Sequence, residues 1–268
     1  MSTVTPTRDI SKIGVFHFGS GDKGDPLGSL EQALKEASTC YSDLSDSLIV
    51  IPEAFNIRTE YGSQCLPRDS IPEDSIRADL MRMSATHKVA LVAGILESPN
   101  DRQMLESVNG PQKGYNSAFL IDRDLCLLLS RKISCDGTGL YELCLHNHCI
   151  KLFPHRGICV CALICMDAEL FQRYLDLPVA DMQWSDSFFA TLRQSLRSRG
   201  RARKILCVPA RFSTNSTFSP EELITRFDLP EVTIAISNGK SPGASAIRSR
   251  NGQPLINRET NKILITGL

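Results

Sequence analysis

The 268-residue chain lacks a long apolar run, and its formal net charge is zero. No stretch approaches the roughly 18 apolar residues that a membrane-spanning helix needs, and the N-terminus, MSTVTPTRDI, lacks the apolar segment of a secretion signal. Thirty basic residues balance thirty acidic ones, so no overall charge attracts the protein to nucleic acid or to an anionic membrane. These absences predict a cytoplasmic protein whose partners are small neutral molecules.

The ten cysteines lack the spacing of a zinc ribbon. Cys159 and Cys161 form a C-x-C pair, and a second group gathers at Cys144, His146, His148 and Cys149. Because no second pair stands at zinc-ribbon spacing, we predict neither a metal nor another cofactor. Without an export signal, cysteines scattered through predicted strands are expected to be reduced thiols rather than a disulfide framework.

The chain also lacks an internal repeat, a low-complexity tract and a linker that would divide it. With 42% hydrophobic residues it can bury a full core. Apolar runs at 13–18, 48–52 and 89–96 predict buried strands, and helices that open at Pro26 and at Ser70 to Pro72 separate them. This alternation predicts one α/β domain over residues 1–268, with helices packed on a sheet.

The second half of the chain continues the pattern. Residues 115–131 predict a hairpin that turns at Arg123 and Asp124. Further strands are predicted at 157–165, 205–209, 232–237, 244–248 and 262–266, and helices at 168–175, 185–200 and 220–227. Five arginines and one lysine fall between Arg193 and Lys204 without an acid. The absence of interleaved aromatic residues favours a solvated helix end over contact with single-stranded nucleic acid.

Three of the predicted strands are followed by, or end in, a residue that can act in catalysis. Glu53 follows the run Leu48 to Pro52, Lys132 closes the hairpin, and Cys165 ends the apolar run GICVCALIC. A thiol at the tip of a rigid strand, with backbone N–H groups just after it, is well placed to attack a carbonyl carbon. Each residue also has a non-functional interpretation. Cys165 could be an unreactive core residue, and Glu53 could stand where its strand leaves the core for solvent.

The ordered set of these motifs resembles the nitrilase, or carbon-nitrogen hydrolase, superfamily. Ile49-Val50-Ile51-Pro52-Glu53 is similar to the family's strand closing in Pro-Glu. Tyr115-Asn116-Ser117-Ala118 with Arg131-Lys132 is similar to its lysine hairpin, and Ile164-Cys165-Met166-Asp167 to its nucleophile motif. The resemblance implies an α-β-β-α sandwich, two mixed sheets face to face with helices outside, and a Glu-Lys-Cys triad.

The resemblance also implies roles for the site residues. Free cysteine has a pKa of about 8.5, so it needs a base and a positive neighbour. Glu53 would take the thiol proton, and Lys132 with the Met166 backbone N–H would hold the oxyanion of a tetrahedral intermediate. Asp167 and Asn116 join the predicted oxyanion and substrate-binding residues. Relatives have a second glutamate after the lysine, and Glu142 is its nearest match here, with a plain surface role as the alternative.

Some segments depart from the family pattern. Relatives usually carry an arginine and Phe-Pro-Glu shortly after the nucleophile, where this chain has Ala168-Glu169-Leu170-Phe171. The Arg-Ala-x-Glu-Asn helix signature is not visible between Ala210 and Val232. In relatives these segments shape the pocket and the dimer interface, so neither the substrate nor a homodimer can be carried over from the resemblance.

The sequence therefore predicts a hydrolase of a non-peptide carbon-nitrogen bond, with a small amide as substrate and a cysteine thioester as intermediate. Nitrile hydrolysis and amide-forming acyl transfer on the same triad remain alternatives, because pocket shape and water access decide between them. A non-catalytic relative that uses the fold for binding or assembly is the alternative from outside enzymology.

Overall fold

The structure is a computed structural model of the chain. It describes residues 8–19, 25–56, 72–97, 115–133, 152–176, 185–198, 200, 202–212, 219–239, 244–249 and 252–268. No helix in these ranges is long and apolar enough to cross a membrane.

Six strands form the first sheet: β1 (Lys12–His17), β2 (Ser47–Ile51), β3 (Ala90–Glu97), β4 (Tyr115–Asp122), β5 (Leu125–Arg131) and β12 (Lys262–Gly267). Their order is β12-β1-β2-β3-β4-β5. The strands β1, β2 and β3 are parallel, and β12, β4 and β5 each run antiparallel to a neighbour. The carboxyl ends of β2 and β3 therefore share an edge with the start of β4 and the end of β5.

Six further strands form the second sheet: β6 (Phe153–His155), β7 (Ile158–Ala162), β8 (Arg203–Ala210), β9 (Val232–Asn238), β10 (Ser245–Arg248) and β11 (Leu255–Asn257). Their order is β11-β10-β9-β8-β7-β6, with β7, β8 and β9 parallel. The Phe18 backbone N–H, just after β1, donates to the Asn238 carbonyl at the end of β9 over 3.3 Å. The carboxyl ends of the central strands in both sheets thus meet at one edge of the molecule.

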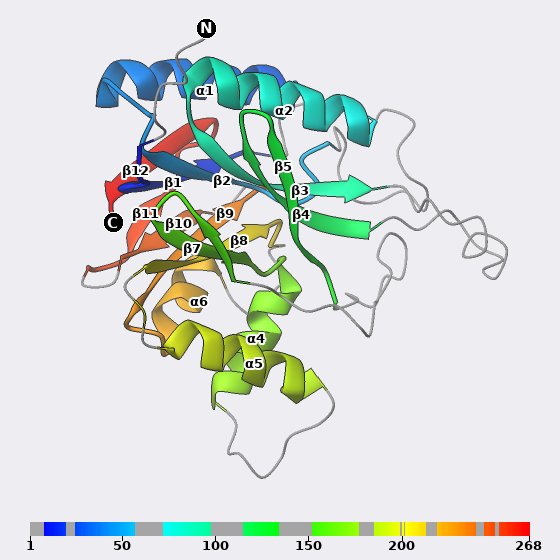
Figure 1. Cartoon of the computed structure of the whole chain (residues 1–268), viewed down its shortest axis with the longest axis vertical. Helices are drawn as coiled ribbons and strands as arrows, with labels where there is room; N and C mark the ends of the chain where they lie inside the picture. The colour runs from blue at the N-terminus through cyan, green and yellow to red at the C-terminus, as the bar shows by residue number, and fades with distance from the viewer. Residues whose placement is uncertain are drawn as a thin grey trace, which may run out of the picture.

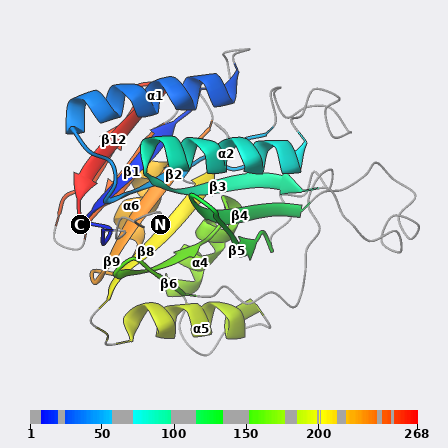
Figure 2. The ribbon, with the colours of Figure 1, turned by 45° about the horizontal axis from the view of Figure 1, so that its top comes forward.

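Helices cover the outer faces of both sheets. The helices α1 (Pro26–Tyr41) and α2 (Glu73–His87) lie on the first sheet, and α4 (Met166–Asp176), α5 (Ser185–Arg197) and α6 (Pro220–Arg226) lie on the second. Figures 1 and 2 show the two sheets between these helix layers. The structure confirms the predicted α-β-β-α sandwich of two mixed sheets.

The side chains of β2 are all buried and alternate between two cores. Leu48 and Val50 belong to the core shared with the second sheet, whereas Ile49 and Ile51 pack with the side chains of α1 and α2. Because both faces are covered, the strand is a continuous apolar run rather than an alternating one. This is the reason why the run could be recognised in the sequence.

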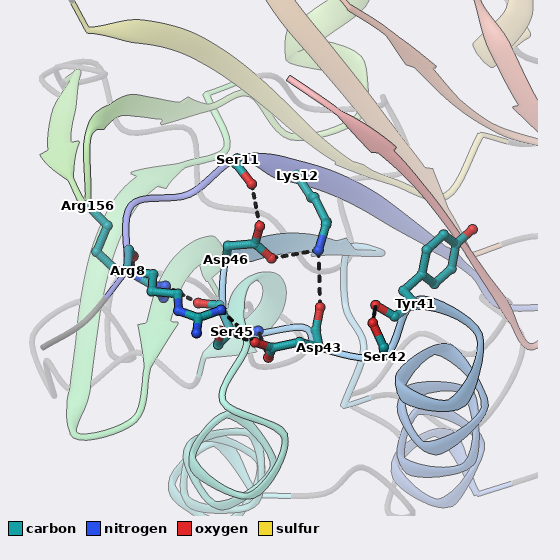
Figure 3. A network of polar contacts seen from close by, with 9 residues as sticks. All are labelled: Arg8, Ser11, Lys12, Tyr41, Ser42, Asp43, Ser45, Asp46 and Arg156. Atoms are coloured by element: carbon teal, nitrogen blue, oxygen red, sulfur yellow. Dashed lines mark hydrogen bonds and ion pairs between the residues drawn. The ribbon is translucent and has the colours of Figure 1, made fainter. Parts of the chain in front are cut away.

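The edge opposite the carboxyl ends is closed by polar contacts between the sheets (Figure 3). Arg156, at the β6–β7 turn, donates from Nε to the Arg8 carbonyl and from Nη2 to the Ser45 carbonyl. Its Nη1 also lies 3.1 Å from Asp122 Oδ2 at the end of β4, and His155 Nε2 is 2.9 Å from the same oxygen. These contacts fix the second sheet to the first at this end.

The predicted elements are present in the described residues, with boundaries shifted by a few positions. The predicted hairpin is β4 and β5, and Arg123 at its turn has a φ of 58°. The helix predicted to open at Ser70 to Pro72 begins at Glu73 with Pro72 as its N-cap. The histidine and cysteine group at residues 144–149 lies outside the described residues.

Candidate functional site

The three predicted strand-end residues come together at the carboxyl edge of the sheets. Glu53 follows β2, Lys132 follows β5, and Cys165 stands between β7 and α4. Glu53 and Lys132 are each only 4% exposed, whereas Cys165 is 9% exposed. All three side chains are therefore buried at this edge and shielded from bulk water.

Glu53 is the centre of the polar contacts. Its Oε2 lies 3.8 Å from Lys132 Nζ and accepts a hydrogen bond of 2.8 Å from Asn116 Nδ2. The Asn116 carbonyl in turn accepts the Lys132 backbone N–H over 2.8 Å. Asn116, predicted as a substrate-binding residue, thus contacts both Glu53 and Lys132.

Cys165 adopts a left-handed backbone conformation with a φ of 45°. Non-glycine residues avoid this region, and such strain is concentrated at functional sites. The Cys165 N–H donates to the Pro209 carbonyl over 3.0 Å, and its carbonyl accepts the Ala168 N–H over 2.9 Å. Both sides of the peptide chain are therefore fixed, and the side chain is held at a sharp strand-to-helix turn.

Groups of both signs of charge act on the Cys165 thiol. They are the Glu53 carboxylate, the Lys132 ammonium and the backbone N–H of Arg211. Burial and the Glu53 charge raise the pKa of the Cys165 thiol well above its usual value, while Lys132 and the Arg211 N–H act in the opposite direction. The surroundings of the sulfur therefore favour the neutral thiol over the thiolate.

The backbone around Glu53 is tightly enclosed. Ala54 has a φ of 47°, a second left-handed position beside a site residue. A side-chain carbon on Gly94 of β3 would lie 2.3 Å from the Glu53 Cα. The Phe55 N–H donates to the Gly94 carbonyl, and the Gly94 N–H donates to the Pro52 carbonyl. Only glycine at position 94 lets β3 approach this close.

The start of α4 connects the nucleophile with the lysine. Met166 and Asp167 are its first two residues. Asp167 Oδ2 accepts the backbone N–H of Ile133, the residue after Lys132, over 3.0 Å. The predicted oxyanion donor, the Met166 N–H, lies at the amino end of the helix, where the helix dipole favours negative charge.

Two groups near the site, the Arg211 backbone N–H and the Glu169 side chain, were not among the site residues predicted from the sequence. The Arg211 N–H is a backbone donor, which any residue at that position would supply, so no residue type signals it. Glu169, in the first turn of α4, is buried, and both its oxygens lack a hydrogen-bond partner within the described residues. An acid in a first helical turn is usually a solvent-exposed partner of the dipole, and its burial could not be predicted.

Three further predictions concern Glu142, a metal site and the basic run at residues 193–204. Glu142 lies outside the described residues, and its predicted role is untested. Among the residues that the structure does describe, no group of three or more metal-ligating side chains is present. In the basic run, Arg197 pairs with Asp228, and Lys204 Nζ donates to the Leu196 carbonyl at the end of α5, which fits the predicted helix end.

Comparisons with known proteins find similar structures but no similar sequences among family models or curated proteins. No protein-family model matches the sequence, and no curated protein matches it either. A mutant of the Nesterenkonia AN1 amidase from the nitrilase superfamily superposes with a TM-score of 0.65 and 19% identity, over 99% of this chain and 93% of that one. A cysteine-to-serine mutant of the same amidase gives 0.67 and 18%, over 98% and 93%.

A third structure of the Nesterenkonia amidase carries the acetamide moiety of fluoroacetamide on its active-site cysteine. It superposes with a TM-score of 0.65 at 18% identity, over 100% of this chain and 93% of that one. The similarity thus covers both sheets and their helices. From the first strand to the last, the chain has the fold of the nitrilase superfamily.

Proposed function

We propose that this protein hydrolyses the carbon-nitrogen bond of a small amide through a thioester on Cys165. The observation that carries the proposal is the convergence of three buried groups: Lys132 Nζ lies 3.8 Å from the Glu53 carboxylate, and the charges of both residues act on the Cys165 thiol. A nucleophile, a base and a fixed positive charge gathered in one place form the minimal set for acyl transfer.

The first half-reaction begins with the thiol. As the sulfur attacks the carbonyl carbon, its proton moves to Glu53, and a tetrahedral intermediate forms. Collapse of the intermediate breaks the carbon-nitrogen bond, and Glu53 returns the proton to the leaving nitrogen, which departs as ammonia. Burial raises the pKa of the Cys165 thiol, which favours proton transfer to Glu53 during the attack over ionisation before it.

The oxyanion of the intermediate would be held by Lys132 Nζ and the Met166 backbone N–H. A single donor of this kind is worth about 3 kcal/mol of transition-state stabilisation. Asn116 and Asp167 act on this arrangement indirectly: Asn116 orients Glu53, and Asp167 holds the segment that follows Lys132. In the second half-reaction, Glu53 takes a proton from water as its oxygen attacks the thioester. The carbon-sulfur bond then breaks, Glu53 returns the proton to the Cys165 sulfur, and the carboxylic acid leaves.

The test is a screen of small aliphatic amides for ammonia release, with intact-mass detection of an acyl adduct. We expect turnover by the wild type, a mass increase located on Cys165, and a loss of at least about 10³-fold in rate for Cys165→Ser. Cys40→Ser removes an exposed thiol near the end of α1 and should retain full activity.

Each outcome separates the proposal from its alternatives. Ammonia release that persists in Cys165→Ser would refute the nucleophile. Hydrolysis of a nitrile but of no amide would replace the substrate class, and adduct transfer to an added amine in preference to water would indicate an acyltransferase. A protein whose Cys165 forms no adduct with any amide would be a binding protein with this fold.

A further inference from the structure

Glu169 is a buried acid that the reaction described above does not use. The side chain is 1% exposed, and within the described part of the chain neither of its carboxyl oxygens has a hydrogen-bond partner. It belongs to the first turn of α4, which begins directly after Cys165. A carboxyl group buried without hydrogen bonds costs several kcal/mol, so its position next to a nucleophile calls for a function.

The first turn of α4 places Glu169 near Lys132. Asp167 in the same turn accepts the Ile133 N–H over 3.0 Å, so this turn packs against the segment that carries Lys132. Burial raises the pKa of Glu169, and the positive charges of Arg173 and Lys132 oppose that rise. Among the described residues, the Lys132 charge therefore acts on at least two carboxyl groups, Glu53 after a strand and Glu169 on the helix.

Other charged residues surround α4. Arg173 lies one turn further along the same helix, and its side chain is exposed. The helices α5 and α6 pack against α4, and their charged residues with described side chains are Arg193, Arg197, Glu221, Glu222 and Arg226. Of the positive groups, Lys132 is the one that also acts on the Cys165 thiol.

We propose that Glu169 is a positioning residue for the Lys132 ammonium and that, through Lys132, it sets the pH at which the Cys165 thiol ionises. The inference rests on the proposed function, in which the Lys132 charge stabilises the developing thiolate and oxyanion. An ionised Glu169 attracts the Lys132 ammonium and adds negative charge near the sulfur, which disfavours the thiolate. A protonated Glu169 does neither, so the Lys132 charge stabilises the thiolate more strongly.

The test compares the pH dependence of Cys165 alkylation in the wild type and in Glu169→Gln. Iodoacetamide reacts with the thiolate, forming the carbon-sulfur bond and releasing iodide, so its rate follows ionisation of the thiol. Glutamine keeps the size of the side chain and removes its charge. We expect the midpoint of the labelling profile to fall by roughly 0.5 to 1 pH unit, measured by mass spectrometry of the Cys165 peptide from neutral pH up to the highest pH at which both proteins stay folded, since the pKa of this thiol is raised.

The control is Glu259→Gln, which removes an acid from the exposed turn before β12 and should leave the midpoint unchanged. A melting temperature of Glu169→Gln equal to or above that of the wild type would accompany the shift, because a buried unpaired carboxyl is lost. A lowered melting temperature with an unmoved midpoint would indicate a merely structural residue and overturn the proposal. A Cys165 that reacts in neither protein would overturn it as well.

The result is separable from the test of function. Amide turnover with identical labelling midpoints in both proteins would leave the proposed reaction standing and remove the role of Glu169. A shifted midpoint in a protein that hydrolyses no amide would retain the electrostatic role and remove the reaction.

Discussion

At the scale of single residues, the Lys132–Glu53 pair is not arranged for maximum stability. A strong charge-assisted hydrogen bond spans about 2.7–2.9 Å, whereas Lys132 Nζ and Glu53 Oε2 are 3.8 Å apart. The short bond of 2.8 Å to that oxygen comes from the neutral Asn116. A buried pair held at this distance recovers little of its desolvation cost, but it leaves Glu53 able to accept a proton from the thiol.

Gly94→Ala tests how strictly the site depends on its backbone. The new methyl group would lie 2.3 Å from the Glu53 Cα, a backbone atom that cannot rotate away. We expect the free energy of unfolding to fall by about 1–3 kcal/mol. Displacement of Glu53 should also slow amide hydrolysis by about 10²-fold. Urea unfolding and ammonia release measure the two effects.

Gly267→Ala is the matched control for this substitution. Gly267 is also a strand residue of the first sheet, but a side-chain carbon there would meet no atom within 4 Å. We expect its stability and turnover to match the wild type. If Gly94→Ala behaved like Gly267→Ala, the close approach of β3 to Glu53 would not matter to the site.

At the scale of elements, the sequence predicted the strands more accurately than the junctions between them. Buried strands such as β2 are apolar on both faces, and this signal is strong at any position. The helix predicted from Ala168 begins at Met166, directly after the nucleophile. The left-handed turn at Cys165 carries neither glycine nor asparagine, the residues that usually signal it, so the sequence predicted the change from strand to helix but not the turn conformation between them.

The candidate site was predictable to the same extent. Glu53, Lys132 and Cys165 each follow an apolar run, and strand ends meet at a sheet edge, so their convergence could be inferred. The Arg211 N–H and the burial of Glu169 could not, because the first is independent of residue type and the second depends on packing between α4 and the rest of the chain.

The β6–β7 turn and the end of β4 give an element-scale prediction of pH dependence. Hydrogen bonds and charge from His155 and Arg156 lower the pKa of Asp122 below its ordinary 3.8, against the effect of burial. A carboxyl whose pKa is lower in the folded state stabilises the protein above its unfolded pKa, and this contribution is lost as the pH falls through the folded value. Asp122→Asn should therefore cost about 1–3 kcal/mol at pH 7.

The difference between wild type and Asp122→Asn should shrink as the pH falls below about 4, where the wild-type carboxyl becomes protonated. Urea unfolding at a series of pH values from 3 to 7 measures it. Asp228→Asn, which breaks an exposed pair with Arg197, should stay within about 0.5 kcal/mol of wild type at every pH. A difference for Asp122→Asn that is constant with pH would contradict the role of its charge.

At the scale of the whole molecule, long-range pairing decides what local patterns leave open. The last strand, β12, returns to pair with β1 in antiparallel register, with Ile13 opposite Thr266. Nothing in the residues 262–266 specifies that neighbour, because either sheet offers an edge to an apolar strand. The layer architecture was inferred from the resemblance, whereas the order of the strands within each sheet required the structure.

The core shared by both sheets predicts that they unfold together, as one domain. Leu48 of β2 is fully buried in this core, as are Cys161 and Cys207 of the second sheet. Burial, with a smaller contribution from Cys159, raises the pKa of Cys161 to about 12, so this thiol should resist alkylation until the chain unfolds. Leu48→Ala should cost about 2–5 kcal/mol and lower the urea midpoint of Cys161 and Cys207 labelling by the same amount as the midpoint of far-ultraviolet circular dichroism. Labelling midpoints that stayed at the wild-type value while the first sheet unfolded would mean two independent units, and the carboxyl edge where Glu53 meets Cys165 would then be an interface between domains.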